Sequence, residues 1–486
     1  MTGNAIVPAP SEAQALSHKA VIMRVPLSCS IRQFSVLIAG LFAFSACMDS
    51  TPPSAPLTPG ISLARSPGGN GPTVKSTDPD TATIDTTLSV RVLGSGYDPG
   101  SRANWAFKGV VSDKIVTNST VFVSSTELIA NITIARDANL GSHDVIVTTS
   151  SGKGGIGTEL FVVTLQTMTL PTIDGRSTDA MAINDAGQVV GSIYDTDGRY
   201  AVRWTKEGGT WTIRKIALEA TVAGSNALAI NEQGTAVGSL NGVKGAVWRI
   251  DGSQTNLGQG QANAINNSDV IAGMIVPDGG GVRAAVWTPS GLGWTGRLLE
   301  RLPGVTRVNC GREEGFGIND DNVIVGVVFD ENCVQIAVQW RPAADGSNWL
   351  APEALSPPGT LAKGVAQAIT GSTIVGTAYP CAALAGCIRK AFRWTVGGAG
   401  APLGALDARA NGVNRAGDIA GSYVRKGGQM TGFVWSPITS AFVFLPTPGG
   451  VGHNWAWDIN DASPRQAVGA IRISSGGQVA TLWTIP

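Results

Sequence analysis

Histidine is the residue that this sequence most lacks. It contains three histidines among 486 residues, and only His453 lies in the last two thirds of the chain. A catalytic triad that depends on histidine, or a metal centre built from several histidines, is therefore excluded from that part. His453 stands beside Trp455 and Trp457, where we expect a loop residue rather than a catalyst.

Charge is also scarce and evenly balanced. Charged residues make up 14% of the chain, and 35 basic residues match 35 acidic ones. Without a basic excess no nucleic-acid partner is predicted, and without an acidic tail no cationic partner is predicted. A nucleophile elbow, a phosphate-binding loop and a dinucleotide fingerprint are missing as well. The sequence thus predicts no catalytic residue, no metal and no cofactor, while a ligand site cannot be located.

Six cysteines are present, and two of them, Cys29 and Cys47, lie near the N-terminus. The other four are Cys310, Cys333, Cys381 and Cys387. No CxxC or Cys/His spacing indicates zinc. Four cysteines allow three connectivities. In an exported protein we expect them to form disulfides, and one possible pairing joins Cys310 to Cys333 and Cys381 to Cys387. Free buried thiols are the alternative.

Glycine, in contrast, is abundant at 63 residues, and much of it belongs to a repeat. The repeat has a period of roughly 40 to 50 residues, which is typical of solenoids and propellers. Each copy carries, with changes, an Ala-x-Ala-Ile-Asn run, a Val-Gly pair and a Trp, and its alternation predicts four short strands with tight turns. The seven copies have at the Asn position Asn184, Asn231, Asn266, Asn319, Thr370, Asn414 and Asn460.

Seven four-stranded sheets can hide their apolar faces and most of their edges by closing into a ring. We therefore predict an all-β chain in which residues 166–486 form a seven-bladed β-propeller. The chain stops three residues after Trp483, so a strand near Thr167–Leu170 is expected to complete the last blade.

The repeated residues have structural explanations. Asn suits a turn because it tolerates left-handed backbone and can bond its own chain. The Gly after Val-Val indicates a bulge or a close approach of neighbouring sheets, and the Trp supplies apolar surface between blades. The turns should differ in the fifth copy, which has Thr370, and in the seventh, which has an insertion around Ser463–Arg465.

The repeat pattern Ala-Ile-Asn-x-x-Gly-x-Val-Val-Gly, followed later by Ala-Phe-x-Trp as in Ala391–Trp394, resembles the extracellular HAF repeats of bacterial surface proteins. The resemblance covers residues 166–486. It implies a propeller at the cell surface and carries over no catalytic residue.

Residues 1–47 read as a targeting region. Two arginines precede an apolar run of about a dozen residues, which fits a secretory signal and is too short to span a membrane. The stretch Phe44–Cys47 resembles the lipobox of bacterial lipoproteins, which implies cleavage before Cys47, a lipid on its sulfur and anchorage to a membrane of the cell envelope. Met23 is an alternative start, and secretion after Ala46 is an alternative fate. Residues 48–71, rich in Pro, Ser and Gly, are expected to form a tether.

Residues 72–165 have a different character, with six or seven strand-like runs that predict a β-sandwich. The segment Gly94–Ser101, together with Ser125–Leu128 and Gly141–Val145, resembles the immunoglobulin-like IPT/TIG domain. In bacterial surface proteins this resemblance implies a spacer without an active site.

Carboxylates are the remaining candidates for chemistry. Asp195–Gly198 is similar to a fragment of a calcium loop but lacks the later ligands, so a hairpin turn is expected. Glu313–Glu314 and Asp320–Asp321 could serve glycoside hydrolysis if they face each other across the channel mouth, and solvated turn residues are the default interpretation. Our first hypothesis is nevertheless a non-enzymatic surface lipoprotein that binds a glycan or a protein partner. The alternative is a carbohydrate-active hydrolase or lyase, and the oligomeric state is left open.

Overall fold

The computed structural model describes residues 71–217, 224–278, 280–306, 310–355, 363–379, 388–448 and 452–486. The predicted signal, Cys47 and nearly all of the tether lie outside these residues, as do Cys381 and Cys387. Within the described ranges the regular elements are all strands. No described helix has the length and hydrophobicity needed to cross a membrane. The all-β prediction is confirmed.

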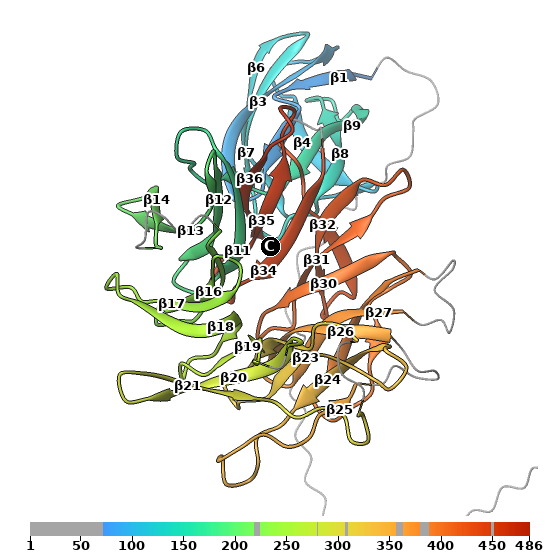
Figure 1. Ribbon diagram of the computed structural model, residues 1–486. Coiled ribbons are helices and arrows are strands. Elements are labelled where there is room, and N and C mark those ends of the chain that lie inside the picture. Colours follow the sequence, from blue (N-terminus) through green and yellow to red (C-terminus); the bar gives the residue numbers. More distant parts are fainter. Residues whose placement is uncertain are drawn as a thin grey trace, which may run out of the picture. The chain divides into compact units, whose positions relative to one another are not determined.

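The first part of the described chain is a two-sheet sandwich (Figure 1). Its strands are β1 (Thr73–Asp78), β2 (Thr81–Thr83), β3 (Thr86–Ser95), β4 (Arg102–Phe107), β5 (Val110–Val111), β6 (Ile115–Ser124), β7 (Glu127–Ile134), β8 (Gly141–Thr148) and β9 (Gly154–Thr164). One sheet has the order β1-β3-β7-β6 and the other β2-β9-β8-β4-β5. This is the immunoglobulin-like architecture that the sequence predicts.

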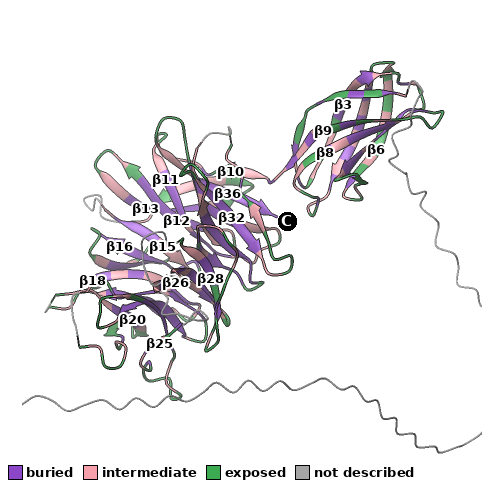
Figure 2. Ribbon diagram, turned by 90° about the vertical axis from the view of Figure 1, so that its right-hand side faces the viewer, coloured by how far each residue is buried: buried purple, intermediate pink, exposed green. Residues whose placement is uncertain are grey.

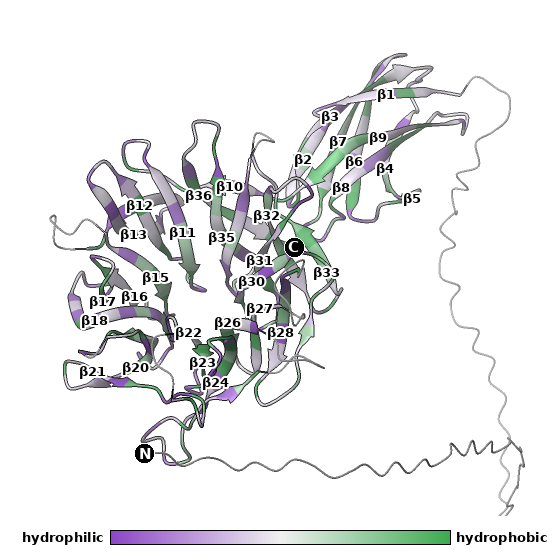
Figure 3. Cartoon of the chain, turned by 45° about the vertical axis from the view of Figure 1, so that its right-hand side comes forward, coloured by the Kyte–Doolittle hydropathy of each residue, from purple (hydrophilic) through white to green (hydrophobic). Residues whose placement is uncertain are grey.

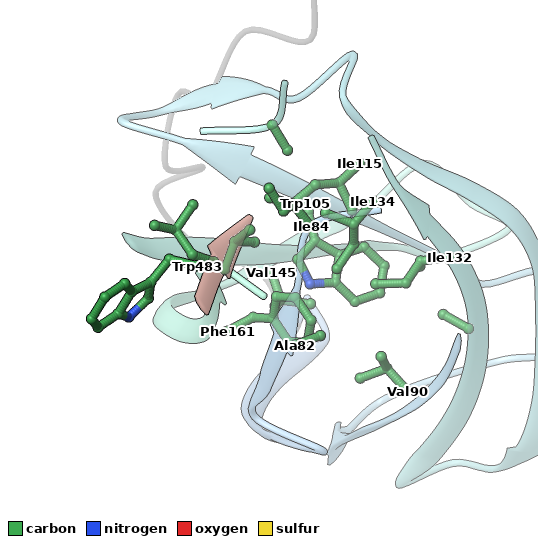
Figure 4. Packing of buried hydrophobic residues seen from close by; sticks show 14 of the residues in the cluster. Ala82, Ile84, Val90, Trp105, Ile115, Ile132, Ile134, Val145, Phe161 and Trp483 are labelled. Atoms are coloured by element: carbon green, nitrogen blue, oxygen red, sulfur yellow. The ribbon is translucent and has the colours of Figure 1, made fainter. Parts of the chain in front are cut away.

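Alternating side chains of both sheets fill the sandwich core. In β7 every second residue is buried, namely Leu128, Ala130, Ile132 and Ile134. Trp105 and Phe161 meet edge to face, with 5.8 Å between ring centroids, and Figure 4 shows them among the buried aliphatic residues. The period-2 pattern thus places one face of each sheet inside, as a sandwich requires.

The remaining strands form seven four-stranded blades within the described residues, and Figure 3 shows the blades around a common centre. Blades 1 to 3 consist of β11 (Ser177–Ile183), β12 (Val189–Asp195), β13 (Gly198–Glu207) and β14 (Thr210–Lys215); β15 (Asn226–Ile230), β16 (Ala236–Leu240), β17 (Lys244–Trp248) and the first part of β18 (Gln254–Ile265); and the rest of β18 with β19 (Ile271–Ile275), β20 (Arg283–Ser290) and β21 (Gly293–Leu298).

Blades 4 and 5 consist of β22 (Glu314–Ile318), β23 (Ile324–Phe329), β24 (Gln335–Trp340) and β25 (Glu353–Ala354), and of β26 (Lys363–Thr370), β27 (Thr373–Tyr379), β28 (Lys390–Thr395) and β29 (Ala401–Pro402). Blades 6 and 7 consist of β30 (Ala408–Val413), β31 (Ile419–Val424), β32 (Met430–Ser436) and β33 (Ala441–Phe444), and of β34 (Asn454–Ile459), β35 (Arg465–Arg472), β36 (Gln478–Ile485) and β10 (Thr167–Thr169).

Blade 7 closes the ring with strands from two distant parts of the sequence. The short strand β10 pairs antiparallel with β36, and Thr167 lies opposite Trp483. The predicted closure is therefore confirmed. It ties the beginning of the propeller segment to its end.

The Trp of each repeat is buried on the third strand of its blade. The seven are Trp204, Trp248, Trp287, Trp340, Trp394, Trp435 and Trp483. Several use the indole N–H to fix a connecting segment; Trp204, for example, donates to the carbonyl of Pro171 at 2.8 Å. Burial of the blade centres, contrasted with exposed hairpin tips, is visible in Figure 2. The predicted packing role of this Trp is confirmed.

The Gly of each Val-Gly pair faces a bulge on the neighbouring first strand. In blade 2 the register shifts between Ala227 and Ala229, and a Cβ on Gly238 would lie 1.8 Å from the carbonyl oxygen of Asn226. The close approach is thus between two strands of one blade, whereas the sequence left open an approach between neighbouring sheets. Only glycine leaves room for the bulged backbone.

One predicted disulfide, Cys310–Cys333, is present in blade 4 and closes a loop across 23 residues of sequence. Cys310 precedes β22, and Cys333 lies in the turn between β23 and β24. Such bonds persist in oxidising compartments, so the bond is typical of a protein outside the cytoplasm.

Candidate functional site

The bulges decide which side chains enter the propeller channel. In every blade the bulge adds one residue to the first strand, at position x of the Ala-x-Ala-Ile-Asn run. We call these seven residues the bulge ring: Met181, Leu228, Asn263, Phe316, Gln367, Asn411 and Trp457. All seven line one cavity of about 330 Å³, the bulge-side cavity. A bulge that re-aims a side chain is a common device at functional sites.

A second cavity, of about 580 Å³, lies at the other end of the first strands, where the repeated Asn residues follow. We call it the asparagine-side cavity. The Ile or Val before each Asn lines it, and four of these residues, Ile265, Ile318, Ile369 and Val413, line the bulge-side cavity too. A belt of aliphatic side chains therefore separates two more polar spaces.

The repeated Asn side chains join neighbouring blades. The amide of Asn184 donates to the carbonyl of Asn231 at 3.0 Å, and the amide of Asn231 donates to the carbonyl of Asn266 at 3.1 Å. The same bond recurs from Asn266 to Asn319, from Asn414 to Asn460 and from Asn460 to Asn184, while Asn319 donates to the carbonyl of Gly371.

Each of these Asn residues also accepts a hydrogen bond from its own turn. In Asn231 the side-chain oxygen accepts the N–H of Thr235 at 2.9 Å. The turn role that the sequence indicates is therefore confirmed, and the sequence did not reveal the bond between blades. Because Asn231 and its counterparts are almost fully buried, their principal role is structural.

The residues after the Asn form a second ring. The backbone N–H of Asp185 donates to the carboxylate of Glu232 at 3.0 Å, and the N–H of Glu232 donates to the side chain of Asn267 at 3.0 Å. Further such bonds run from Asn267 to Asp320, from Arg415 to Asp461 and from Asp461 to Asp185. Burial raises the pKa of Glu232. These acids thus serve first as acceptors that link adjacent turns.

Both rings change at blade 5. Its turn runs directly from Thr370 to Thr373, which pair with each other, and Gly371 stands where other blades have a polar side chain. Blade 7 differs as well, because Asn460 bonds the N–H of Gln466 six residues later. The two departures predicted from the sequence, at Thr370 and at the Ser463–Arg465 insertion, are both confirmed.

The four candidate carboxylates do not form one group. Asp320 and Asp321 line the asparagine-side cavity, whereas Glu313 and Glu314 lie at the opposite end of strand β22. Glu313 is paired with Arg283 and Arg301 at 2.9 and 3.0 Å. Glu314 is paired with Arg312 at 2.7 Å. The arrangement in which these two pairs face each other is therefore wrong, because a whole strand separates them.

Two other acids, which the sequence analysis did not single out, lie at the junction of blades 7 and 1. Asp458 lines both cavities, and its carboxylate accepts the N–H of Ile183 at 3.1 Å. Asp179 is buried and accepts the indole N–H of Trp457 at 3.1 Å. Burial raises the pKa of each carboxyl to about 6. The repeat contains a signal that singles out Asp458, because this residue replaces the Ala or Gly of the other six copies.

The other singled-out residues have local structural roles. His453 Nδ1 accepts the N–H of Met430 at 3.0 Å, and His453 does not line either cavity. Asp195 lies opposite Gly198 in a hairpin and pairs with Lys215 at 3.0 Å, as a turn residue would. In the described part of the chain no group of three or more His, Cys, Asp or Glu side chains could hold a metal ion.

No protein-family model matches this chain, and no curated protein matches it. Among solved structures, it is similar to a puromycin-hydrolyzing peptidase from Mycobacterium tuberculosis, with 13% identity and a TM-score of 0.39 over 65% of this chain and 50% of the peptidase. It is also similar to a gluconolactonase from Xanthomonas campestris, with 14% identity and a TM-score of 0.34 over 66% of this chain and 90% of the enzyme. A Hadza microbial sialidase has 11% identity and a TM-score of 0.34, over 86% and 94% of the two chains. Likenesses at these identities say nothing about the activity of this chain.

Proposed function

We propose that this protein is a non-enzymatic binding protein of the bacterial cell envelope, whose propeller channel recognises a glycan or a protein partner. The observation that carries the proposal is the bulge ring. The bulge recurs in all seven blades and places position x of each repeat in one cavity. The side chain at this position varies, from Met and Leu to Asn and Trp. A uniform scaffold with variable inward positions is suited to recognition.

The electrostatics of the channel also favour binding over catalysis. Among the acids of the asparagine-side cavity, Glu232, Asp320 and Asp461 each accept a backbone N–H from the neighbouring blade. An acid that holds the blades together is poorly suited to donate or accept protons during turnover. The bulge ring itself has no ionisable side chain.

The location within this proposal is at the cell surface or in the periplasm. The HAF-like repeats, the IPT/TIG-like sandwich and the lipobox-like Phe44–Cys47 together support a lipoprotein that is secreted, anchored through Cys47 and held off the membrane by the tether. The Cys310–Cys333 disulfide fits this route. A test is metabolic labelling with a palmitate analogue: label on the wild type but not on Cys47→Ala supports the anchor, and equal labelling refutes it.

A carbohydrate-active enzyme is the second candidate, and one observation favours it. Asp458 and Asp179 have carboxyl pKa values raised to about 6, which is a property of general acids near neutral pH. In this reading Asp458, which lines both cavities, would be the general acid, whereas Asp179 lines neither cavity.

One experiment separates the two candidates. The purified full chain is incubated with immobilised oligosaccharides and polysaccharides and with envelope extracts, and every bound glycan is analysed by mass spectrometry for cleavage. Stable binding without new products is expected. Turnover that is lost in Asp458→Asn would replace the binding proposal with the enzyme.

A further inference from the structure

The bulge-side cavity has an unusual lining for a propeller of such regular repeats. It combines two aromatic rings, Phe316 and Trp457, with the amides of Gln261, Asn263, Gln367 and Asn411. Among the described residues no Lys, Arg or His lines it, and Asp458 is the only ionisable one that does. Such a lining suits a ligand that has an apolar face and several hydroxyl groups, and offers no cation for a phosphate or a carboxylate.

Trp457 is held in place by a hydrogen bond at its indole nitrogen. Its indole N–H donates to Asp179 at 3.1 Å, and Asp179 also accepts the side-chain amide of Gln478 at 3.4 Å. Asp179 itself is only 8% exposed, whereas Trp457 remains partly exposed to the cavity. A ring whose polar edge is already bonded presents its face at little further entropic cost.

Asp458 departs from the repeat at a position that lines the cavity. The other six blades place Ala or Gly at this position, so the fold requires only a small side chain there. Room for the carboxylate comes from the neighbouring blade, where Gly412 replaces the usual Ala; a Cβ on Gly412 would lie 2.7 Å from Asp458 Oδ1. Its carboxylate accepts the N–H of Ile183 from blade 1, and the same group lines the bulge-side cavity, where it can also accept a hydroxyl group of a ligand.

We infer that the bulge-side cavity binds an uncharged sugar residue of a glycan, with the ring stacked on Trp457 and hydroxyl groups bonded to Asp458 and to the amides of the bulge ring. A pyranose has the required chemistry, since its C–H face is apolar and its rim carries hydroxyls that donate and accept. Asp179 acts as a positioning residue through Trp457. The inference rests on the proposed function and narrows its ligand to neutral glycans.

The test measures binding of the full chain to neutral oligosaccharides of glucose, xylose, mannose and N-acetylglucosamine by calorimetry and by tryptophan fluorescence. Trp457→Ala and Asp458→Ala are each expected to weaken the best ligand by about 10-fold or more, which is the effect of losing one well-placed contact. Trp457→Phe, which keeps a ring, should recover most of the affinity. Glu232→Gln, in the asparagine-side cavity, is the matched control and should bind as the wild type does.

A positioning role for Asp179 has its own readout. In Asp179→Leu the indole loses its acceptor, so the fluorescence change on adding the bound oligosaccharide should differ from that of the wild type, and Asp179→Asn should restore it. Thermal unfolding confirms in each case that the variant is folded. Asp458→Ala should still fold, because Ala is common at this position in the repeat, although it loses the hydrogen bond from Ile183.

The outcomes distinguish the inference from the proposed function. Glycan binding that survives both Trp457→Ala and Asp458→Ala overturns the inference and leaves the binding function standing. Loss of glycan binding in Glu232→Gln alone moves the site to the asparagine-side cavity and also overturns it. If no neutral oligosaccharide binds but an envelope protein is captured, the glycan is refuted while the protein-partner form of the function stands.

Discussion

The ring of asparagines should be a major source of the propeller's stability, and Asn231→Ala tests this. The Asn231 amide donates to the carbonyl of Asn266 at 3.1 Å and to Asp269 Oδ1 at 2.9 Å, and its oxygen accepts the N–H of Thr235 at 2.9 Å. The side chain is 4% exposed, so water cannot replace these partners. With about 1 kcal/mol for each hydrogen bond and an added cost for buried groups left unpaired, we expect a loss of about 2–4 kcal/mol.

Blade 5 supplies the matched control. Thr370 occupies the same repeat position, and no side-chain hydrogen bond of Thr370 occurs among the described residues. Thr370→Ala should therefore cost less than about 1 kcal/mol. Both variants are compared with the wild type by urea unfolding, followed by tryptophan fluorescence and circular dichroism. An Asn231→Ala cost no larger than that of Thr370→Ala would refute the role of the ring.

Three further predictions concern a glycine, a disulfide and a buried carboxyl group. Gly238→Ala should cost about 2 kcal/mol or more by forcing Cβ against the carbonyl of Asn226, while Gly293→Ala, with open space around it, should be near neutral in urea unfolding. Cys333→Ser should lower the unfolding free energy by about 3 kcal/mol, as expected for a 23-residue loop, and an unchanged urea midpoint would contradict this. The folded-state pKa of Asp458, raised by burial to about 6, lies above its unfolded value, so the contribution of this group to stability is full below about pH 4 and is lost as pH rises through 6. Asp458→Asn should thus gain on the wild type by up to about 3 kcal/mol between pH 4 and pH 7.5, and parallel pH curves would exclude the shift.

The fold could be predicted because its information is local and repeated. Each blade signals its strands by alternation and its turns by Asn and Gly, and seven copies of a weak signal make a strong one. Even the closure could be anticipated, because one strand was left over before Ser177 and one was missing after Trp483. Neither the prediction of the blades nor that of the closure depends on knowing a contact between distant blades.

The site could be predicted less well because it depends on the bulge. In an unbulged strand, positions two apart share a face, so residue x of Ala-x-Ala would point away from both alanines. The bulge opposite the Val-Gly glycine changes this and turns Met181, Phe316 or Trp457 into the channel. The Gly of the Val-Gly pair indicated a bulge or a close approach. It did not indicate which side chain the bulge redirects, because that side chain is on the neighbouring strand.

Spacing in the sequence is also a poor basis for pairing carboxylates in this fold. Glu313–Glu314 and Asp320–Asp321 are close in the chain, yet an extended strand between them takes them to opposite ends of the blade. Asp179 and Asp458 are 279 residues apart and lie at one blade junction, where Asp179 bonds Trp457 and Asp458 bonds Ile183, because the ring closes there. In a closed ring, nearness along the chain is a poor guide to nearness in space.

The repeats themselves indicate where function should be sought. Seven copies of one structural unit have the same packing needs, so a residue that differs from its six counterparts cannot be explained by those needs alone. At the Asn position the exception, Thr370, comes with a shorter turn, and the structure accounts for it. At the Ala position the exception is Asp458, whose carboxylate accepts the N–H of Ile183 from blade 1, a bond that the Ala or Gly of the other six copies cannot make. Burial raises the pKa of this carboxyl despite that bond, which is the physical reason to expect a hydroxyl-bearing ligand to bond it beside Trp457.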